Sequence, residues 1–414
     1  HIGKLGLEKF YEHELHGTVG VQHVEVNANG RTLRVLNESP PVQGNNLHLT
    51  IDSSLQKVAE EAFGNNSGAV VAIDPNNGEI LALVSMPIFD PNLFVNGISF
   101  IKYNELRESH QRPLFNRALS GQYPPGSTTK PFYGLAGLES AFAKKEEEIH
   151  CIGYYKLPNE ERRYRDWKKQ GHGPVNLTDA ITQSCDVYFY DLAFRLGIDL
   201  MSSFLGEFGY GIETGVDSTG ERKGILPSRE WKRGHDGMPW FPGETLITGI
   251  GQGYLLATPL QLANSIAAFS VRGTRYQPHL VKSVEKVPEY NRVEIASRVA
   301  GRYEIKKMHN WEHVHKAMIN VVHGLRGTAR GINQGLQYKM AGKTGTAQVF
   351  EVAQDEEYDE ETVIEKLRDH ALFVSYAPAD DPQIAVAVIV ENGGSGSAVA
   401  APIARRILDA FLLE

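Results

Sequence analysis

The sequence predicts an α+β fold: a five-stranded antiparallel sheet with helices on both faces, an all-helical subdomain, and a small β-rich N-terminal segment. The apolar runs 69–74 and 79–85 are joined by the turn residues 75–78, which is typical of a hairpin. A second such pair, 371–376 and 384–391, lies near the C-terminus. Most of the chain between the two pairs has the apolar spacing of helices.

The N-terminal segment is mixed in character. Alternating residues at 21–25 and 32–36 predict two strands, and Asn29-Gly30 between them is a strong hairpin signal. We therefore expect residues 1–50 to form a β-rich segment separate from the main domain, which we place at 51–414.

The C-terminal strands and the first hairpin would together form the main sheet. The stretch 338–350, which carries Lys343, precedes the C-terminal pair, so packing of the first hairpin beside these strands gives five. A helix is predicted at 52–63, and an amphipathic helix at 399–413 would lie on the sheet. The segment 258–269 opens with a capping box that has proline at its first helical position, which predicts a further helix.

The composition of the 414 residues, 41% hydrophobic and 22% charged, is ordinary for a globular protein. No run approaches the roughly 18 apolar residues of a membrane-spanning helix, and no signal peptide is visible. The chain begins at His1, so we expect it to be a fragment. A net charge of −8 without a basic stripe argues against nucleic acid as a partner.

A Pro-Pro-Gly turn at 124–126 is followed by a helical pattern, so Ser127 is predicted to stand where a helix begins. Lys130 is three residues further on and shares its helix face. Pro131 suits a first helical turn, where its missing N–H would have had no partner. A serine beside a lysine can be a nucleophile beside its base. The alternative is a helix capped by Ser127 with Lys130 in solvent.

Two later motifs favour the catalytic interpretation. Ser184-Cys185-Asp186 and Lys343-Thr344-Gly345 complete a Ser-x-x-Lys, Ser-x-Asn-like and Lys-Thr-Gly set in the order used by penicillin-binding proteins and serine β-lactamases. Longer stretches resemble the penicillin-binding protein 2 family, the monofunctional class B transpeptidases of the Gram-negative elongation machinery. These stretches are 123–131, 164–169, 249–254, 343–350 and 391–394.

The resemblance implies a penicillin-binding (transpeptidase) fold in which residues 1–50 are the remnant of a linker or pedestal. It implies a peptidoglycan D,D-transpeptidase of cell elongation that needs no catalytic cofactor and is inhibited by β-lactams. Its partners would be stem peptides ending in D-Ala-D-Ala, the SEDS-family glycosyltransferase RodA and the scaffold MreC. Members carry a single-pass N-terminal anchor and work at the periplasmic face of the bacterial inner membrane, so we expect this fragment to lack that anchor.

The expected chemistry is acyl transfer. Ser127 attacks a carbonyl once Lys130 has accepted its proton. Lys343 would be a second cation that makes the neutral form of Lys130 easier to reach, and Ser184 would relay protons. Asp186 stands where relatives more commonly have asparagine, which puts in doubt whether it contacts the substrate as an amide would.

The oxyanion needs two fixed donors. The backbone N–H of Ser127 is one, and family analogy gives the N–H of Thr346 as the other. Gly345 would let its strand approach closely. The hydroxyls of Thr344 and Thr346, with Lys343, would seat the carboxylate of a peptide ending in D-Ala-D-Ala. The acyl-enzyme would then release D-alanine and pass its acyl group to an amine.

Cys151 and Cys185 are the chain's two cysteines, with Asp166 and His172 between them. Two thiolates, an imidazole and a carboxylate can hold a tetrahedral structural zinc ion, although their spacing fits no standard short motif. A buried free thiol and a disulfide are the alternatives. Related proteins that bind zinc in this region favour the metal by resemblance.

Two other functions use the same scaffold, namely a serine β-lactamase and a non-catalytic β-lactam sensor domain. A nucleotide-binding enzyme is set aside, because the glycines of 249–253 have the wrong spacing and follow no convincing strand. The acidic stretch 354–361 is predicted to be a solvated loop. His313 and His315 point to different helix faces, so we expect both on the surface.

Overall fold

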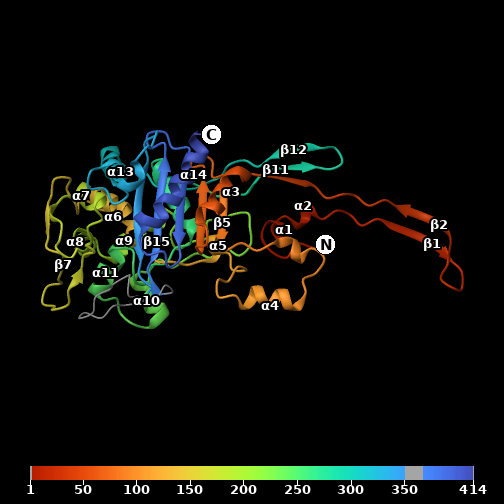
Figure 1. Ribbon diagram of the computed structural model, residues 1–414, viewed down its shortest axis with the longest axis horizontal. Helices are drawn as coiled ribbons and strands as arrows, with labels where there is room; N and C mark the ends of the chain where they lie inside the picture. The colour runs from red at the N-terminus through yellow and green to blue at the C-terminus, as the bar shows by residue number, and fades with distance from the viewer. Residues whose placement is uncertain (1, 350–366, 414) are drawn as a thin grey trace.

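A five-stranded antiparallel sheet forms the centre of the structure, a computed structural model that describes residues 2–349 and 367–413 (Figure 1). Its strands lie in the order β14-β15-β16-β4-β5. Their bounds are β14 Ala341–Ala347, β15 His370–Ala377, β16 Ile384–Val390, β4 Gly68–Ile73 and β5 Ile80–Met86. The hairpin of β4 and β5 joins the C-terminal strands because β4 pairs with β16, where Val388 lies opposite Val70. The predicted sheet is confirmed.

Helices cover both faces of this sheet. Every residue of β16 is buried, whichever face it points to, as expected for a covered sheet. Helix α12 (Pro259–Ser270) packs on β4, β15 and β16, whereas α14 (Ala401–Leu413) packs on β15 and β16 together with α3 (Ser53–Phe63). The predicted α+β fold class is therefore confirmed.

Two helix starts follow the predicted capping chemistry. Asp52 Oδ1 accepts the backbone N–H groups of Ser54 and Leu55 at 2.8 and 3.0 Å, which fixes the start of α3. At α12, Gln261 N–H donates to Thr258 Oγ1 while the Gln261 side chain accepts from Thr258 N–H. Both helices then bury their apolar face against the sheet.

The helical subdomain lies beside the sheet and contains most of the remaining helices (Figure 1). These are α6 Lys130–Glu139, α7 Leu177–Thr182, α8 Asp186–Leu196, α9 Ile198–Glu207, α10 Arg229–Asp236, α11 Pro242–Gly249 and α13 Met308–His323. Two small ribbons cross this region: β6 (Ile149–Cys151) pairs with β9 (Gly173–Val175), and β7 (Tyr154–Tyr155) pairs with β8 (Tyr164–Arg165). Strands of two or three residues are too short to show an alternating pattern, so the sequence did not predict them.

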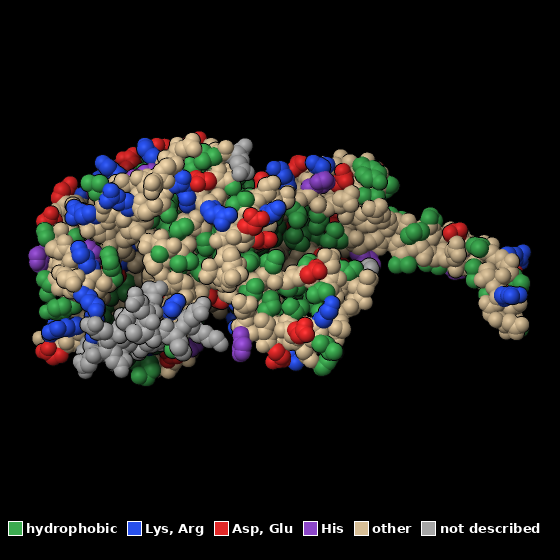
Figure 2. All heavy atoms as spheres, in the orientation of Figure 1, with side chains coloured by type: hydrophobic (Ala, Val, Ile, Leu, Met, Phe, Trp, Pro, Cys, Tyr) green, Lys and Arg blue, Asp and Glu red, His purple; other side chains and the backbone are tan. Residues whose placement is uncertain are grey.

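The N-terminal segment extends away from the body (Figure 1). The predicted hairpin is present as β1 (Val21–Val26) and β2 (Thr32–Ser39), and every residue of it is exposed. Figure 2 shows hydrophobic side chains along this narrow arm. Val24 and Leu33 are exposed hydrophobic residues of the hairpin. Strand β3 (Asn46–Leu49) attaches the segment to the body by pairing with β11 (Val281–Lys286), a contact that the sequence did not predict.

The other regular elements of the described residues are short or peripheral. They are α1 Gly6–Phe10, α2 Glu12–Leu15, α4 Phe100–Glu108, α5 Arg117–Ser120, β10 Thr274–Tyr276, β12 Asn291–Glu294 and β13 Val299–Arg302. Over residues 2–349 and 367–413, no helix is both long and apolar enough to cross a bilayer. The predicted loop 354–361 lies outside the described residues.

The prediction that His315 is a surface residue was wrong. The ring of His315 is buried in α13, stacks on Trp311 with 4.5 Å between ring centroids, and meets the hydroxyl of Tyr376 at 2.6 Å. His313 is half-buried and contacts Thr178 Oγ1 at 2.9 Å. The helical pattern separated the two faces correctly, but α13 is covered on both sides by the sheet edge and by α7.

Candidate active site

The turn that carries Ser127 leads directly into a helix. Residues Gly126–Thr129 form a short 3₁₀ helix, and α6 begins at Lys130 with Pro131 in its first turn. In a 3₁₀ helix, side chains three residues apart eclipse one another, so Ser127 and Lys130 lie on the same face. Ser127 is half-buried and Lys130 is completely buried. The pairing of the Ser127 hydroxyl with the Lys130 amine stays a prediction, and the contacts of Lys130 are with Ser184 and Asp186.

Ser184 stands between two buried lysines. Lys130 Nζ donates to Ser184 O at 2.9 Å and to Ser184 Oγ at 3.3 Å, and Lys343 Nζ donates to Ser184 Oγ at 2.9 Å. The backbone of Ser184 has a φ of 58°, a left-handed conformation that costs energy in a residue with a Cβ. This strained turn joins α7 to α8 and holds one hydroxyl within reach of both amines.

Lys343 has an unusual electrostatic environment. Burial, assisted by the charge of Lys130, holds the pKa of Lys343 well below its usual value, while the charge of Asp186 acts in the opposite direction. The sequence predicts that Lys343 is a second cation that lowers the pKa of Lys130. The structure differs because the side chain of Lys343 is completely buried, on a strand in which Thr346 alone is exposed.

Asp186 is held by protein groups. Its Oδ1 accepts from Lys130 Nζ at 2.7 Å, and its Oδ2 accepts from the backbone N–H of Trp167 at 3.0 Å. Burial raises the pKa of Asp186. The indole of Trp167 donates to Ser184 O at 3.1 Å and is itself 60% exposed. Both oxygens of Asp186 therefore already have partners from the chain.

Strand β14 lies against the Ser127 turn. A Cβ on Gly126 would stand 2.6 Å from Thr346 O, and one on Gly345 would stand 2.9 Å from Thr128 Cγ2, so neither glycine tolerates a side chain without movement. Gln252 also holds this edge, because its Nε2 donates to Thr346 O at 2.9 Å. The backbones of the turn and the strand meet as the prediction for Gly345 requires.

The two threonines of β14 differ in environment. Thr346 is exposed, whereas Thr344 is 8% exposed and its Oγ1 lies 2.8 Å from Thr328 Oγ1. Sequence reasoning missed both Thr328 and Gln252. The glycine-rich stretch around Gln252 was a signal for a close backbone approach, whereas nothing local marks Thr328.

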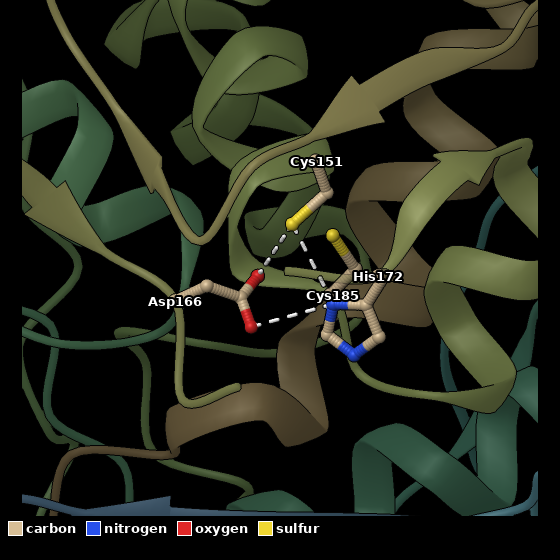
Figure 3. A group of neighbouring side chains, drawn as sticks. All are labelled: Cys151, Asp166, His172 and Cys185. Carbon is tan, nitrogen blue, oxygen red and sulfur yellow. Dashed lines mark hydrogen bonds and ion pairs between the residues drawn. The ribbon is translucent and has the colours of Figure 1, made fainter. Parts of the chain in front are cut away.

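A second buried cluster lies on the other side of the Ser184 turn. Figure 3 shows Cys151, Asp166, His172 and Cys185 converging from different segments. Their ligand atoms all lie within 4.8 Å of one another. Cys151 Sγ is 3.5 Å from Asp166 Oδ2 and 3.6 Å from His172 Nδ1, and both cysteines are free thiols. The disulfide alternative therefore does not describe this structure.

The chemistry of this cluster suits a metal ion. A hydrogen bond with Cys185 lowers the pKa of Cys151 to about 6, although burial opposes this shift. Burial would raise the pKa of Asp166, but hydrogen bonds from His172 and from the Lys168 backbone hold it well below its usual value. Thiolates at about 2.3 Å and imidazole nitrogens at about 2.0 Å from zinc have mutual spacings like those seen here. The four residues fit a structural zinc ion.

Asp166 joins the two clusters. Its Oδ2 accepts from the backbone N–H groups of Asp186 and Val187 at 2.7 and 3.1 Å, so it caps the start of α8 from a distant segment. Cys185 is the residue between Ser184 and Asp186. A displacement of Cys185 or Asp166 would therefore also displace the turn that contains Ser184.

A serine at a helix start, followed three residues later by a buried lysine that contacts a second hydroxyl, is typical of enzymes that pass an acyl group through a serine ester. The fold and this set of residues are those typical of serine acyl transferases. Residues 68–409 match the family described as the penicillin binding protein transpeptidase domain, and residues 1–49 match the penicillin-binding protein dimerisation domain. The chain belongs to the penicillin-binding protein transpeptidase family.

Curated relatives match nearly the whole chain. The peptidoglycan D,D-transpeptidase MrdA of Acinetobacter baumannii is 45% identical over 413 residues, which cover 100% of this chain and 60% of the relative. MrdA of Escherichia coli K12 is 42% identical over 418 residues, covering 100% of this chain and 65% of the relative. The chain thus spans somewhat less than two thirds of the length of these relatives.

Solved structures show the same fold. Pseudomonas aeruginosa PBP2 in complex with WCK 5153 is 47% identical with a TM-score of 0.86, covering 100% of this chain and 84% of that one. Helicobacter pylori PBP2 in complex with MreC is 33% identical with a TM-score of 0.83, covering 100% and 72%. The penicillin G acyl-enzyme of Mycobacterium tuberculosis penicillin-binding protein A is 28% identical with a TM-score of 0.73, covering 93% and 82%.

Proposed function

We propose that this chain is a peptidoglycan D,D-transpeptidase in which Ser127 forms the acyl-enzyme. The observation that carries the proposal is the Ser184 hydroxyl shared by the amines of Lys130 and Lys343, next to the helix start that presents Ser127. Both amines are buried and contact the same hydroxyl, so two positive charges there would repel each other. This repulsion favours the loss of a proton from one of the amines. An unprotonated amine is what a serine nucleophile needs as its base.

In the first half of the reaction, Ser127 Oγ attacks the carbonyl between the two terminal D-alanines. Its proton passes to the lysine pair, with Ser184 linking the two amines, and then to the nitrogen of the departing D-alanine. Asp186 holds Lys130 in place, since their ion pair spans 2.7 Å. In the second half an amine replaces D-alanine and the protons run in reverse.

The oxyanion would lie between the backbone N–H groups of Ser127 and Thr346. Support comes from the contact of Gly126 with Thr346, which brings these two segments together. Loss of one such donor typically slows acyl transfer about 10²- to 10³-fold. The terminal carboxylate would sit at the exposed hydroxyl of Thr346, with Thr344 and Lys343 behind it.

A relative supports one of the proposed partners, whereas the proposed location comes from the family resemblance. We place the enzyme at the periplasmic face of the inner membrane, where it would bind stem peptides and β-lactams. MreC is a proposed partner because the Helicobacter relative is found in complex with it, and RodA is proposed from the family resemblance. Residues 1–50 would act as the linker or pedestal and 51–414 as the transpeptidase domain.

Zinc is proposed as a structural ion held by Cys151, Asp166, His172 and Cys185. Four protein ligands leave no open position, so the ion would supply no catalytic step. It would neutralise the thiolates and hold the loop of Asp166 against the start of α8. Equimolar zinc by elemental analysis is the expected result, whereas a metal-free protein of full stability would contradict it.

The function is tested by two measurements on one sample. A peptide ending in D-Ala-D-Ala should lose its terminal D-alanine and transfer its acyl group to an added amine, while radiolabelled penicillin should form an adduct that lasts for many minutes. Penicillin turnover faster than minutes would instead indicate a β-lactamase. A stable adduct without any release of D-alanine would indicate a sensor domain.

A further inference from the structure

A cluster of three polar side chains lies at the end of the sheet next to the Ser127 turn, and the reaction proposed above gives it no role. The cluster contains Arg117 at the start of α5, Tyr123 shortly before the turn, and Glu391 directly after β16. Arg117 is only 3% exposed and Tyr123 only 5%. Polar groups buried this deeply almost always have partners, so their contacts show what they hold in place.

The carboxylate of Glu391 joins the other two side chains. Its Oε1 accepts from the hydroxyl of Tyr123 at 2.7 Å, and its Oε2 lies 2.9 Å from Nε of Arg117. Arg117 is held by the backbone in turn, because it donates to Arg112 O at 3.2 Å and to Gln111 O at 2.7 Å. Hydrogen bonds to a charged acceptor are stronger than those between neutral groups. The position of the Tyr123 hydroxyl is therefore well defined.

Tyr123 is connected closely to the nucleophile. Its backbone N–H and carbonyl pair with the carbonyl and N–H of Ala257, both at 2.9 Å. Only residues 124–126 separate Tyr123 from Ser127, and two of these are prolines. Because each proline ring fixes φ near about −65°, this connection has little freedom. A displacement of Tyr123 would therefore move the turn that presents Ser127.

The segment that begins at Glu391 also contacts the strand on the other side of the site. Further along this segment, Gly396 lies so close to β14 that a Cβ on it would stand 2.4 Å from Gly345 O. Gly345 precedes Thr346, whose N–H is the proposed second oxyanion donor. The segment thus contacts Tyr123 at one end and the strand of Thr346 at the other.

The rings of Tyr123 and His370 provide a second contact between the same parts. They meet edge-on, with centroids 5.4 Å apart and ring planes at 86°. The backbone N–H of Asn392 donates to Nδ1 of His370 at 3.0 Å, which orients this ring. His370 lies opposite Ala347, the residue after Thr346, in the pairing of β15 with β14. Tyr123 is thus packed against the end of the sheet where Thr346 lies.

We propose that the hydrogen bond from Tyr123 to Glu391 positions the two oxyanion donors relative to each other. Tyr123 fixes the turn of Ser127, Glu391 fixes the segment that contacts the strand of Thr346, and Arg117 holds the carboxylate. Oxyanion stabilisation depends on donors that are in place before the charge develops. The three side chains are positioning residues, because they act through the backbone of the turn and the strand. This inference rests on the proposed function, since the donors have a role only if Ser127 forms an acyl-enzyme.

The test removes one hydroxyl. Tyr123→Phe keeps the ring and loses the donor to Glu391. We expect the second-order rate constant of acylation by penicillin to fall about tenfold, less than the 10²- to 10³-fold typical of losing a whole oxyanion donor. Infrared spectra of the acyl-enzyme give a second readout. The ester carbonyl band should move to higher frequency, because displaced donors polarise the carbonyl less.

Tyr338→Phe is the matched control. The hydroxyl of Tyr338 donates to Asp409 Oδ1 at 2.8 Å, and Asp409 pairs with Arg405, so the same three kinds of side chain meet on α14. This variant should acylate at about the wild-type rate and leave the carbonyl band unshifted. Glu391→Gln and Glu391→Ala complete the set. Glutamine keeps an oxygen that can accept from Tyr123, so Glu391→Gln should acylate faster than Glu391→Ala.

A wild-type rate or an unshifted carbonyl band in Tyr123→Phe would overturn the inference, as would equal slowing in Tyr338→Phe. If Tyr123→Phe does not fold, the two Glu391 variants decide, and equal rates in both would overturn the inference. If the wild type itself forms no adduct with penicillin and releases no D-alanine, the proposed function fails instead.

Discussion

Two buried polar clusters meet at the turn Ser184–Asp186, and they differ in how their polar groups are satisfied. In the lysine cluster, the amines of Lys130 and Lys343 donate to oxygens of Ser184 and Asp186, so each amine has protein partners. In the cysteine cluster, two sulfurs, an imidazole nitrogen and a carboxylate point at one another. Groups of both clusters have protein partners, and the second cluster also has the residue types that bind zinc.

We assign the lysine cluster to the proposed proton transfers and the cysteine cluster to holding the neighbouring loop in place. Groups that must exchange protons need hydrogen bonds that can shift, as at Ser184. Groups that fix a loop need bonds that do not shift, as a four-ligand zinc ion provides. Cys185 is next to both Ser184 and Asp186, so under the zinc proposal the cysteine cluster would position the turn that contains Ser184. The following predictions test that division, from the largest effect to the smallest.

The largest effect is expected from Ser184→Ala, which removes the hydroxyl between the two amines. Acylation by penicillin should slow about 10²- to 10⁴-fold, the usual contribution of a positioned proton-transfer group. Ser270→Ala is the matched control, because Ser270 is equally buried but donates to Ala267 O within α12. The measurement is the second-order rate constant of acylation of each variant. A Ser184→Ala rate within threefold of wild type would contradict a role of Ser184 in proton transfer.

The cysteine cluster is tested by His172→Ala against His150→Ala. His150 is exposed and next to Cys151, so its loss removes an imidazole without touching the cluster. Mutation of a residue that only hydrogen-bonds to a metal ligand typically lowers metal affinity about 10- to 100-fold. Loss of His172, a proposed ligand itself, should lower zinc affinity more. Competition with a chromophoric chelator gives the zinc affinity. Equal affinities of both variants would refute the assigned ligand set.

A third prediction concerns pH and the variant Asp186→Asn. The charge of Asp186 raises the pKa of Lys343, against the larger lowering by burial and by Lys130. Without that charge the amine of Lys343 takes up its proton at a lower pH, so the acid limb of the acylation profile should move to lower pH. A shift of the acid limb to higher pH in stopped-flow measurements would contradict the assignment.

The smallest effect is expected from Thr328→Val. This change removes the hydroxyl 2.8 Å from that of Thr344 and leaves a side chain of similar shape. A hydrogen bond of this kind contributes about 0.5–1.5 kcal/mol, which corresponds to a few-fold slower acylation. A loss beyond a hundredfold would mean that Thr328 contacts the substrate itself.

The sheet could be predicted from the sequence because its strands are long apolar runs bounded by turn residues, as at 69–74 and 79–85. The meeting of Lys130, Ser184 and Lys343 could be expected because three ordered motifs resemble one family. Local patterns could not show the left-handed backbone of Ser184, the pairing of β3 with β11, or the contact of Thr328 with Thr344, since each depends on residues distant in the sequence. The burial of His315 could not be predicted either, because it depends on Tyr376, which is distant in the sequence.

Mass spectrometric mapping of the penicillin adduct, in wild type and in Ser127→Ala, tests the central claim most directly. The account predicts one adduct per chain, on the peptide that contains Ser127, and no adduct in the folded Ser127→Ala variant. An adduct on another residue, or equal labelling of the variant, would contradict the assignment of Ser127 as the nucleophile.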